Sequence, residues 1–174
     1  RAGMTADSIS GMRPAFAKDG TVTAANASAI NDGSAALVVA SADFAAAHGL
    51  KPLARVTHYA MGGCAPEWVM MAPEHSINKT AEMAGRKPAD FDLHEINEAF
   101  SAAAVALTRK LELDASRVNV NGGAIALGHP LGMSGARLAT TATYELHRQN
   151  RRYALCTMCI GVGQGYATII ESAS

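Results

Sequence analysis

The stretch Tyr153-Ala-Leu-Cys-Thr-Met-Cys-Ile-Gly-Val-Gly-Gln-Gly-Tyr-Ala-Thr-Ile-Ile170 decides the fold class. Its two apolar runs, residues 153–158 and 166–170, have the pattern of buried strands, and a short glycine-rich segment joins them. A connection this short makes the two strands antiparallel neighbours. Strand-like and helix-like segments alternate through the rest of the chain, which is typical of α/β proteins. The sequence therefore predicts an α/β fold around a mixed sheet.

Local signals predict the remaining elements. Ser41 caps a helix over 42–48, Pro73 opens a helix that reaches about residue 84, and Ser134 caps a helix that reaches residue 149. We further expect a helix over 98–111, turns at 19–20 and 31–33, and strands over 35–40, 53–60, 91–96 and 117–120.

Cys159 lies where the strand over 153–158 breaks into the glycine-rich turn. A cysteine there is partly released from the sheet, and the N–H groups of the neighbouring glycines can point at an oxyanion. The alternative is a small apolar side chain in a packed hairpin. The glycine turn favours a functional cysteine.

Cys156 and Cys159 also form a Cys-x-x-Cys pattern. Residues three apart in a strand point to opposite faces, so these two thiolates cannot easily bind one metal ion. Redox pairs of this kind normally open a helix, and a total of three cysteines does not suggest a disulfide framework. We expect neither a metal site nor a redox pair.

His129 lies in the run Asn121-Gly-Gly-Ala-Ile-Ala-Leu-Gly-His-Pro-Leu-Gly-Met-Ser-Gly-Ala-Arg137, which contains five glycines. Glycines let a ligand or another backbone come close, and Pro130 stiffens the position after the histidine. An incidental histidine on a surface loop is the alternative. A titratable ring fixed on such a segment is better suited to chemistry than to packing.

A third segment, His94-Glu-Ile-Asn-Glu-Ala-Phe100, precedes an alanine-rich stretch. Asn97 is a good helix N-cap and Glu98 suits the positive first turn of a helix, so a purely structural role is a serious alternative for both. We interpret His94 as a hydrogen-bonded structural histidine.

Together these segments resemble the thiolases, enzymes that make or cleave 3-oxoacyl-CoA. The matching pieces are Asn-Glu-Ala-Phe at 97–100, the runs 122–137 and 159–165, and residues 13–33, which resemble the entrance to the family's carboxy-terminal domain. The resemblance covers nearly the whole chain in the family's order. It implies a thiolase-like carboxy-terminal domain, a mixed sheet with helices on both faces, normally paired with a similar amino-terminal half.

The resemblance implies an acyltransferase of the acetyl-CoA C-acyltransferase type and assigns roles to four residues. His129 activates the nucleophilic thiol and donates to a thioester oxygen, and Cys159 moves the proton at the acyl α-carbon. Asn97 helps His129 to polarise the thioester oxygen, directly or through a water. The backbone N–H of Gly161 serves the other oxyanion site.

Substrate binding is implied for Ser28, beside the pantetheine arm, and for Ala99 and Phe100, which line the same channel. Ser28 stabilising a turn and Phe100 packing in the core are the alternatives. Met70 and Met71 either border the acyl pocket or are ordinary packing. Coenzyme A and acyl-CoA are then substrates, with no permanently bound cofactor. Met133 and the run 156–165 look more like degradative 3-oxoacyl-CoA or 3-oxoadipyl-CoA thiolases.

The family's nucleophilic cysteine lies in the amino-terminal half, which this chain does not resemble. We therefore expect a fragment or subunit that is inactive without that half, in an enzyme that is a dimer or tetramer and is cytoplasmic or in an organellar matrix. We place residues 1–32 in the tail of the loop region and entrance segment, and 33–174 in the carboxy-terminal domain.

Composition excludes several partners. Fifteen basic and fifteen acidic residues give zero formal net charge, which indicates neither nucleic acid nor an anionic membrane surface. No apolar stretch approaches the roughly 20 residues that span a bilayer.

Two alternatives to a thiolase stay open. One is a non-catalytic acyl-CoA-binding or scaffolding subunit, which needs no acid/base pair. The other is a decarboxylating condensing enzyme, a class that lacks the Asn-Glu-Ala-Phe and Cys-x-Gly-x-Gly features.

Overall fold

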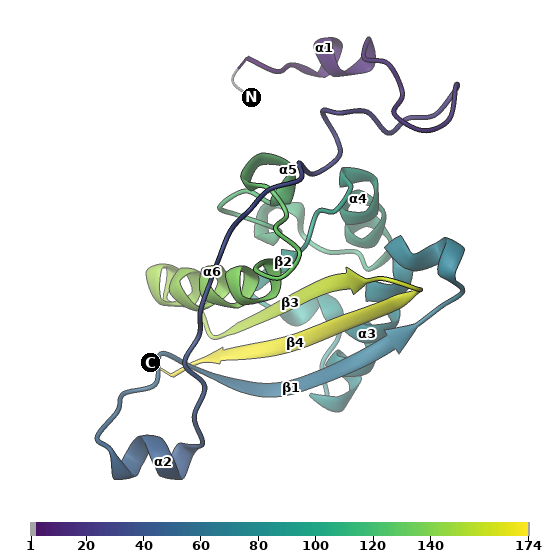
Figure 1. Cartoon of the computed structure of the whole chain (residues 1–174). Coiled ribbons are helices and arrows are strands. Elements are labelled where there is room, and N and C mark those ends of the chain that lie inside the picture. Colours follow the sequence, from purple (N-terminus) through teal and green to yellow (C-terminus); the bar gives the residue numbers. More distant parts are fainter. Residues whose placement is uncertain (1–2, 174) are drawn as a thin grey trace.

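A four-stranded mixed sheet forms the centre of the protein, whose computed structural model describes residues 3–173 (Figure 1). The strands lie in the order β1-β4-β3-β2. β4 is antiparallel to both β1 and β3, whereas β2 is parallel to β3. The predicted mixed sheet is confirmed. The strands span Ala54–Gly63 (β1), Leu93–Ile96 (β2), Tyr153–Ile160 (β3) and Gln164–Ser172 (β4).

Helices cover both faces of the sheet. On one face, α6 (Ser134–Gln149) buries Leu138, Ala142 and Leu146 against a group that includes Ala154 and Cys156 of β3. On the other face, α3 (Ala72–Met83) packs onto a group that includes Leu155 of β3. Successive strand residues point to opposite faces, which explains why Leu155 and its neighbours belong to different clusters.

A third apolar cluster joins α4 (Ser101–Lys110) to the end of β2, through Ala104, Leu107 and Ile96. The shorter helices are α1 (Ala6–Ser10), α2 (Ala42–Ala47) and α5 (Ala124–Leu127), and the 3-10 turns are η1 (Pro66–Met71), η2 (Pro88–Asp90) and η3 (Ala115–Arg117). None of the helices within residues 3–173 is long and apolar enough to cross a membrane.

Several predicted signals act as expected. The Ser41 hydroxyl accepts a hydrogen bond from the Phe44 amide at the start of α2. Gly85 has a φ of 63° just beyond α3, a conformation that glycine adopts without strain. The turn at 19–20 closes with a 2.9 Å hydrogen bond from the Gly20 amide to the Ala17 carbonyl.

The prediction of a buried strand over 35–40 is wrong. These residues form a single extended segment with no strand pairing, and Val38 and Val39 are 97% and 81% exposed. An apolar run becomes a strand only where a sheet edge accepts its backbone hydrogen bonds, and no edge among residues 3–173 does so. Figure 1 shows this segment running between α1 and α2, which lie at opposite ends of the molecule.

Other boundaries also differ from the prediction. α4 begins at Ser101 rather than residue 98, so Asn97 is not its N-cap. Ser134 is the first residue of α6 and makes no cap bond to the helix. Residues 117–120 form only a bridge between Val118 and His94, because Asn119 turns the chain with a φ of 49°. Residues 31–33 make no turn, since they continue the extended segment.

Candidate active site

His129 lies at the end of the glycine-rich loop, between α5 and α6. Gly128 before it has a φ of 95°, and Pro130 follows it. A Cβ at Gly128 would overlap the side chain of Asn31, so the extended segment passes directly against the loop. The His129 amide donates to the Ala29 carbonyl at 3.4 Å, which ties the two segments together.

Both ring nitrogens of His129 have protein partners. Nε2 lies 3.2 Å from Nδ2 of Asn97, and Nδ1 lies 2.6 Å from Oγ of Ser134. The Ser134 hydroxyl also donates to the Pro130 carbonyl at 3.1 Å. One consistent assignment has Nδ1–H donating to Ser134, and Nε2 accepting from Asn97. In this tautomer the lone pair is on Nε2.

Burial lowers the pKa of His129, and the nearby Arg137 guanidinium lowers it further. Both influences act against the charged ring. At neutral pH the imidazole is therefore neutral, which is the form that can accept a proton.

Asn97 follows β2 directly and is 4% exposed. The backbone N–H of Asn97 donates to the Thr157 carbonyl of β3 at 2.9 Å, which continues the parallel pairing of β2 and β3. The Asn119 side chain holds Ile96, the residue before Asn97. It accepts a hydrogen bond from the Ile96 backbone amide at 2.8 Å and donates one to the Ile96 carbonyl at 2.9 Å. Oδ1 of Asn97 is buried without a partner among the described residues.

Glu98 has a different role from the predicted helix-start charge. Its carboxylate accepts from the side chain of Asn119 and from the backbone amide of Ile125, both at 3.1 Å. A Cβ at Gly123 would overlap this carboxylate. Glu98 therefore anchors the start of the glycine-rich loop to the end of β2, where Asn97 also lies.

Cys159 lies near the end of β3 opposite Gly165 of β4, and it is half-buried. Ile96 pairs with Thr157 in register, so Asn97 and Cys159 both lie at this end of the sheet. Burial raises the pKa of the Cys159 thiol. Among residues 3–173, no hydrogen bond joins this thiol to His129 or Asn97.

Gly161 opens the turn between β3 and β4. A Cβ placed on it would meet nothing within 4 Å, so the space on the Cβ side of Gly161 is open. Val162 and Gly163 have φ values of 63° and 80°. The Gly163 carbonyl accepts from the Cys64 amide at 2.8 Å, which fixes the turn against the end of β1.

Ser28, Ala99 and Phe100 lie together. The Ser28 amide donates to the Ala99 carbonyl at 3.0 Å, and Ala27 and Phe100 form an antiparallel bridge. The Ala29 carbonyl reaches His129 from the same segment. The structure thus brings the three predicted binding residues next to the His129 loop.

An apolar cleft of about 480 Å³ lies beside Phe100. The rings of Phe16 and Phe100 meet edge to face, with centroids 6.0 Å apart. Met70, Met71 and Trp68 of η1 also line this cleft. Both methionines therefore line a cleft that begins at a predicted binding residue.

Groups of three or more histidine, cysteine, aspartate or glutamate side chains able to hold a metal ion do not occur in the described part of the chain. His94 is 1% exposed, and its Nε2 lies 2.8 Å from the Pro88 carbonyl. Burial lowers the pKa of His94. His94 is therefore buried and hydrogen-bonded, as expected of a structural histidine.

Comparison with known families identifies the family of the chain. The family model described as "Thiolase, C-terminal domain" matches residues 50–172, and "Thiolase, N-terminal domain" matches residues 1–43. The chain belongs to the thiolase family.

Individual relatives agree with this membership. The chain is 53% identical over 169 residues to the 3-oxoadipyl-CoA/3-oxo-5,6-dehydrosuberyl-CoA thiolase of Escherichia coli K12, covering 96% of this chain and 42% of the relative. The crystal structure of the Bacillus anthracis acetyl-CoA acetyltransferase matches with a TM-score of 0.95 at 44% identity, covering 99% of this chain and 44% of that one. Human mitochondrial 3-ketoacyl-CoA thiolase in complex with CoA matches with a TM-score of 0.91 at 42% identity, covering 100% and 44%. The chain therefore spans less than half the length of these relatives.

Sequence reasoning missed three residues of the site, namely Ser134, Asn119 and Glu95. The sequence predicts Ser134 as a helix cap and Asn119 as part of a strand. Asparagine adopts the left-handed backbone conformation of tight turns more often than most residues do. This preference is the one local signal that Asn119 lies in a turn. Nothing local distinguishes Glu95, which is 2% exposed and pairs with Arg137.

Proposed function

We propose that this chain supplies the acid/base half of a thiolase active site, which transfers acyl groups between an enzyme cysteine and coenzyme A. The observation that carries the proposal is the hydrogen-bonded series Asn97–His129–Ser134. A neutral imidazole with its Nε2 lone pair on the Asn97 side is suited to general base catalysis near neutral pH.

In the cleavage direction, His129 takes the proton of the nucleophilic thiol, and the thiolate attacks the 3-oxo carbon of the substrate. The bond between the α- and β-carbons breaks, and its electron pair passes to the α-carbon of the departing acyl-CoA. The Cys159 thiol protonates that carbon. Its raised pKa supports this role, because the thiol holds its proton at neutral pH.

Coenzyme A then completes the cycle. Its thiol gives a proton to the Cys159 thiolate and attacks the acyl-enzyme thioester, while the imidazolium of His129 returns its proton to the departing cysteine. Asn97 and the N–H of Gly161 stabilise the two oxyanions that form on the way. The open space at Gly161 is compatible with a substrate oxygen there.

We assign the nucleophile to an amino-terminal half outside these 174 residues. Cys156 is 7% exposed within the apolar cluster under α6, and burial raises its pKa. The Cys64 thiol donates to the Trp68 carbonyl at 3.2 Å, near the end of β1. Neither cysteine is placed beside His129 by a hydrogen bond that the structure describes.

The same amino-terminal half is the proposed partner for the exposed apolar segment 35–40. This segment lies within the residues that the N-terminal family model matches. It would add a strand to the partner's sheet and so satisfy its backbone groups. We keep the boundary near residue 33 as a proposal, and the complete enzyme as a dimer or tetramer.

The apolar cleft beside Phe100 is the proposed channel for the pantetheine arm and acyl chain. Its walls carry aromatic and methionine side chains, which suit flexible apolar chains of varied length. We propose 3-oxoacyl-CoA cleavage as the physiological direction, on the basis of Met133 and the run 156–165.

A pair of cysteine variants tests the proposal. Cys159→Ala removes the acid/base thiol, whereas Cys156→Ala removes a buried thiol three residues earlier in the same strand. With the amino-terminal half supplied, 3-oxoacyl-CoA cleavage should fall by about 10²–10⁴-fold in Cys159→Ala and remain within a few-fold in Cys156→Ala. Equal activities in the two variants would refute the assigned role. Binding of coenzyme A without any acyl transfer in the wild type would favour the non-catalytic subunit instead.

A further inference from the structure

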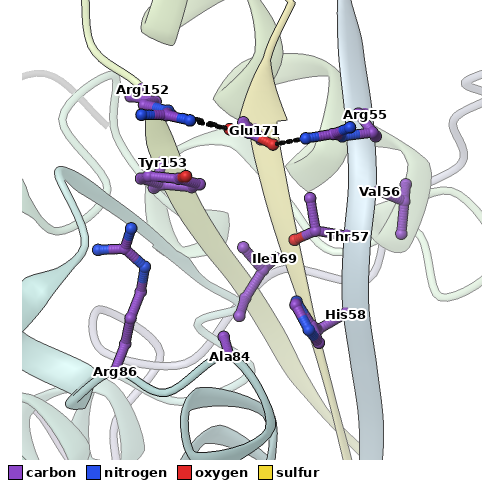
Figure 2. Close-up of a pocket in the computed structure, with 10 residues that line it drawn as sticks. All are labelled: Arg55, Val56, Thr57, His58, Ala84, Arg86, Arg152, Tyr153, Ile169 and Glu171. Carbon is purple, nitrogen blue, oxygen red and sulfur yellow. Dashed lines mark hydrogen bonds and ion pairs between the residues drawn. The ribbon is translucent and has the colours of Figure 1, made fainter.

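A second cavity, of about 460 Å³, lies at the end of the sheet opposite to Cys159 (Figure 2). It is lined where β1 begins, β4 ends and β3 begins. Its charged and polar walls include Arg55, His58, Arg86, Arg152, Tyr153 and Glu171.

The floor of the cavity is one row of cross-strand neighbours. Glu171 of β4 pairs with Arg55 of β1 on one side and with Tyr153 of β3 on the other. Directly paired residues point to the same face of a sheet, so these three side chains stand together. A bulge between Val56 and His58 shifts the register of β1. The bulge turns His58 to the face that Arg55 occupies.

The wall of the cavity is the end of α3. This helix covers the sheet face as far as Ala84 and then stops at Gly85, with the amide of Arg86 donating to the Ala81 carbonyl at 2.9 Å. The chain then turns away from the helix axis, so α3 ends before the row at Glu171, which is 5% exposed. Figure 2 shows Arg86 on one side of this opening, with Arg152 and Arg55 flanking Glu171.

The charges in the cavity do not balance. Three guanidinium groups line it, whereas Glu171 is its single carboxylate. Hydrogen bonds from Arg55 and Arg152 lower the pKa of Glu171 to about 2, so this carboxylate stays charged and orients both guanidinium groups. The third guanidinium, of Arg86, lies 4.0 Å from the ring centre of Tyr153 and has no carboxylate partner among the described residues.

One lining residue carries a buried polar atom. Nδ1 of His58 is buried and has no hydrogen-bond partner in the part of the chain that the structure describes. His58 lines the cavity together with the three arginines.

We propose that this cavity binds a small anion that carries phosphoryl groups, independently of acyl transfer at the other end of the sheet. Each guanidinium has five N–H donors, and Glu171 uses only part of those on Arg55 and Arg152. The donors lie on three parts of the chain: Arg55 in β1, Arg152 just before β3 and Arg86 just after α3. A tetrahedral phosphoryl group accepts from several directions, whereas a planar carboxylate accepts mainly in its plane.

Calorimetric titration with inorganic pyrophosphate tests the proposal, on the protein in whichever form is soluble, alone or with its amino-terminal half. Saturable binding is expected, with succinate, a dicarboxylate of similar size, binding at least about 10-fold more weakly. Arg86→Gln should weaken pyrophosphate binding by about 10-fold, the effect of one charged hydrogen bond. Arg109→Gln, at an exposed position of α4 outside the cavity, should leave it unchanged.

A second variant, Arg152→Lys, keeps the charge but loses the fork of donors, and it should also weaken binding several-fold. This variant decides the matter if Arg86→Gln fails to fold by circular dichroism. The absence of saturable pyrophosphate binding would overturn the proposal. Equal losses in Arg86→Gln and Arg109→Gln, or equal binding of succinate, would do the same.

Discussion

The carboxylate of Glu95 lies 3.0 Å from a guanidinium nitrogen of Arg137, and this buried pair joins β2 to the first turn of α6. Glu95 comes two residues before Asn97, and Arg137 comes three residues after Ser134. The ion pair therefore holds together the two segments that carry the hydrogen-bond partners of His129. Burial raises the pKa of Glu95 to about 7, although Arg137 opposes this shift.

The first prediction concerns stability against pH. The pKa of Glu95 is about 7 in the folded protein and 4.5 in its ordinary state, so the folded protein holds this proton more tightly. Its contribution to stability is complete below pH 4.5 and is lost as the pH rises to about 7. The loss is about 3 kcal/mol as an order of magnitude. Glu95→Gln should remove this fall in stability from the dependence of the free energy of unfolding on pH.

Urea unfolding across this pH range measures the effect. His94 and His129 titrate in both proteins, so the difference between the two profiles isolates Glu95. Glu74→Gln, which removes the partner of Lys110, is the control and should keep the wild-type pH dependence. A Glu95→Gln profile parallel to the wild type would show that Glu95 does not titrate in this range.

The second prediction concerns Ser134. Ser134→Ala removes the partner of Nδ1 of His129 and so frees the ring to change tautomer or turn. With the amino-terminal half supplied, kcat should fall by about 10–100-fold with little change in KM, since one hydrogen bond to a charged intermediate is lost. Ser116→Ala, which loses a hydroxyl bond to Asp114, should have wild-type kinetics. An unchanged kcat in Ser134→Ala would mean that the ring is held by other contacts.

The third prediction uses two glycines of the His129 loop. Gly123→Ala forces a Cβ into the Glu98 carboxylate, whereas a Cβ at Gly132 meets nothing within 4 Å. Gly123→Ala should lower the free energy of unfolding by about 1–3 kcal/mol, because the carboxylate must leave its hydrogen bonds with Asn119 and Ile125. Gly132→Ala should stay within about 0.5 kcal/mol of the wild type. Denaturant unfolding compares the two, and similar values would contradict the described contact with Glu98.

The fourth prediction concerns the extended segment. Val38 is 97% exposed, so Val38→Asp should leave the fold of this chain unchanged but prevent its association with an amino-terminal half. Met83→Asp, on the exposed side of α3, is the matched control and should still associate. Sedimentation velocity of the mixed halves measures both. The wild-type chain alone should aggregate, and a stable monomer with cooperative unfolding would contradict this expectation.

Local sequence signals predicted most of the secondary structure. Ser41 and Gly85 bound their helices as expected, because a cap or a left-handed turn depends on a few adjacent residues. The antiparallel pairing of β3 and β4 followed from the short connection alone. The start of α4 was misplaced because Asn97 and Glu98 have the composition of a helix start, yet their side chains bind distant segments.

The candidate site was predicted in part. The glycine-rich run identified His129, and the structure places Asn97 against its ring. The roles of Ser134 and Asn119 in the site were not predicted, because their partners lie on other segments or across a turn. Their local context also suited ordinary structural roles. The pairing of Glu95 with Arg137 spans 42 positions in the chain, which no local pattern reveals.

The sequence by itself determined the main helices, the four strands of the mixed sheet and the family to which the chain belongs. The elements depend on periodicity and on turn residues, which act over a few positions, whereas the family resemblance rests on the motifs at 97–100, 122–137 and 159–165. Tertiary structure alone decided how His129 is held and how the arginine-lined cavity forms where α3 ends. Those features depend on contacts and burial, and both exist only when distant segments pack together. For the same reason residues 35–40 remain extended, since a strand needs a neighbouring edge to pair with.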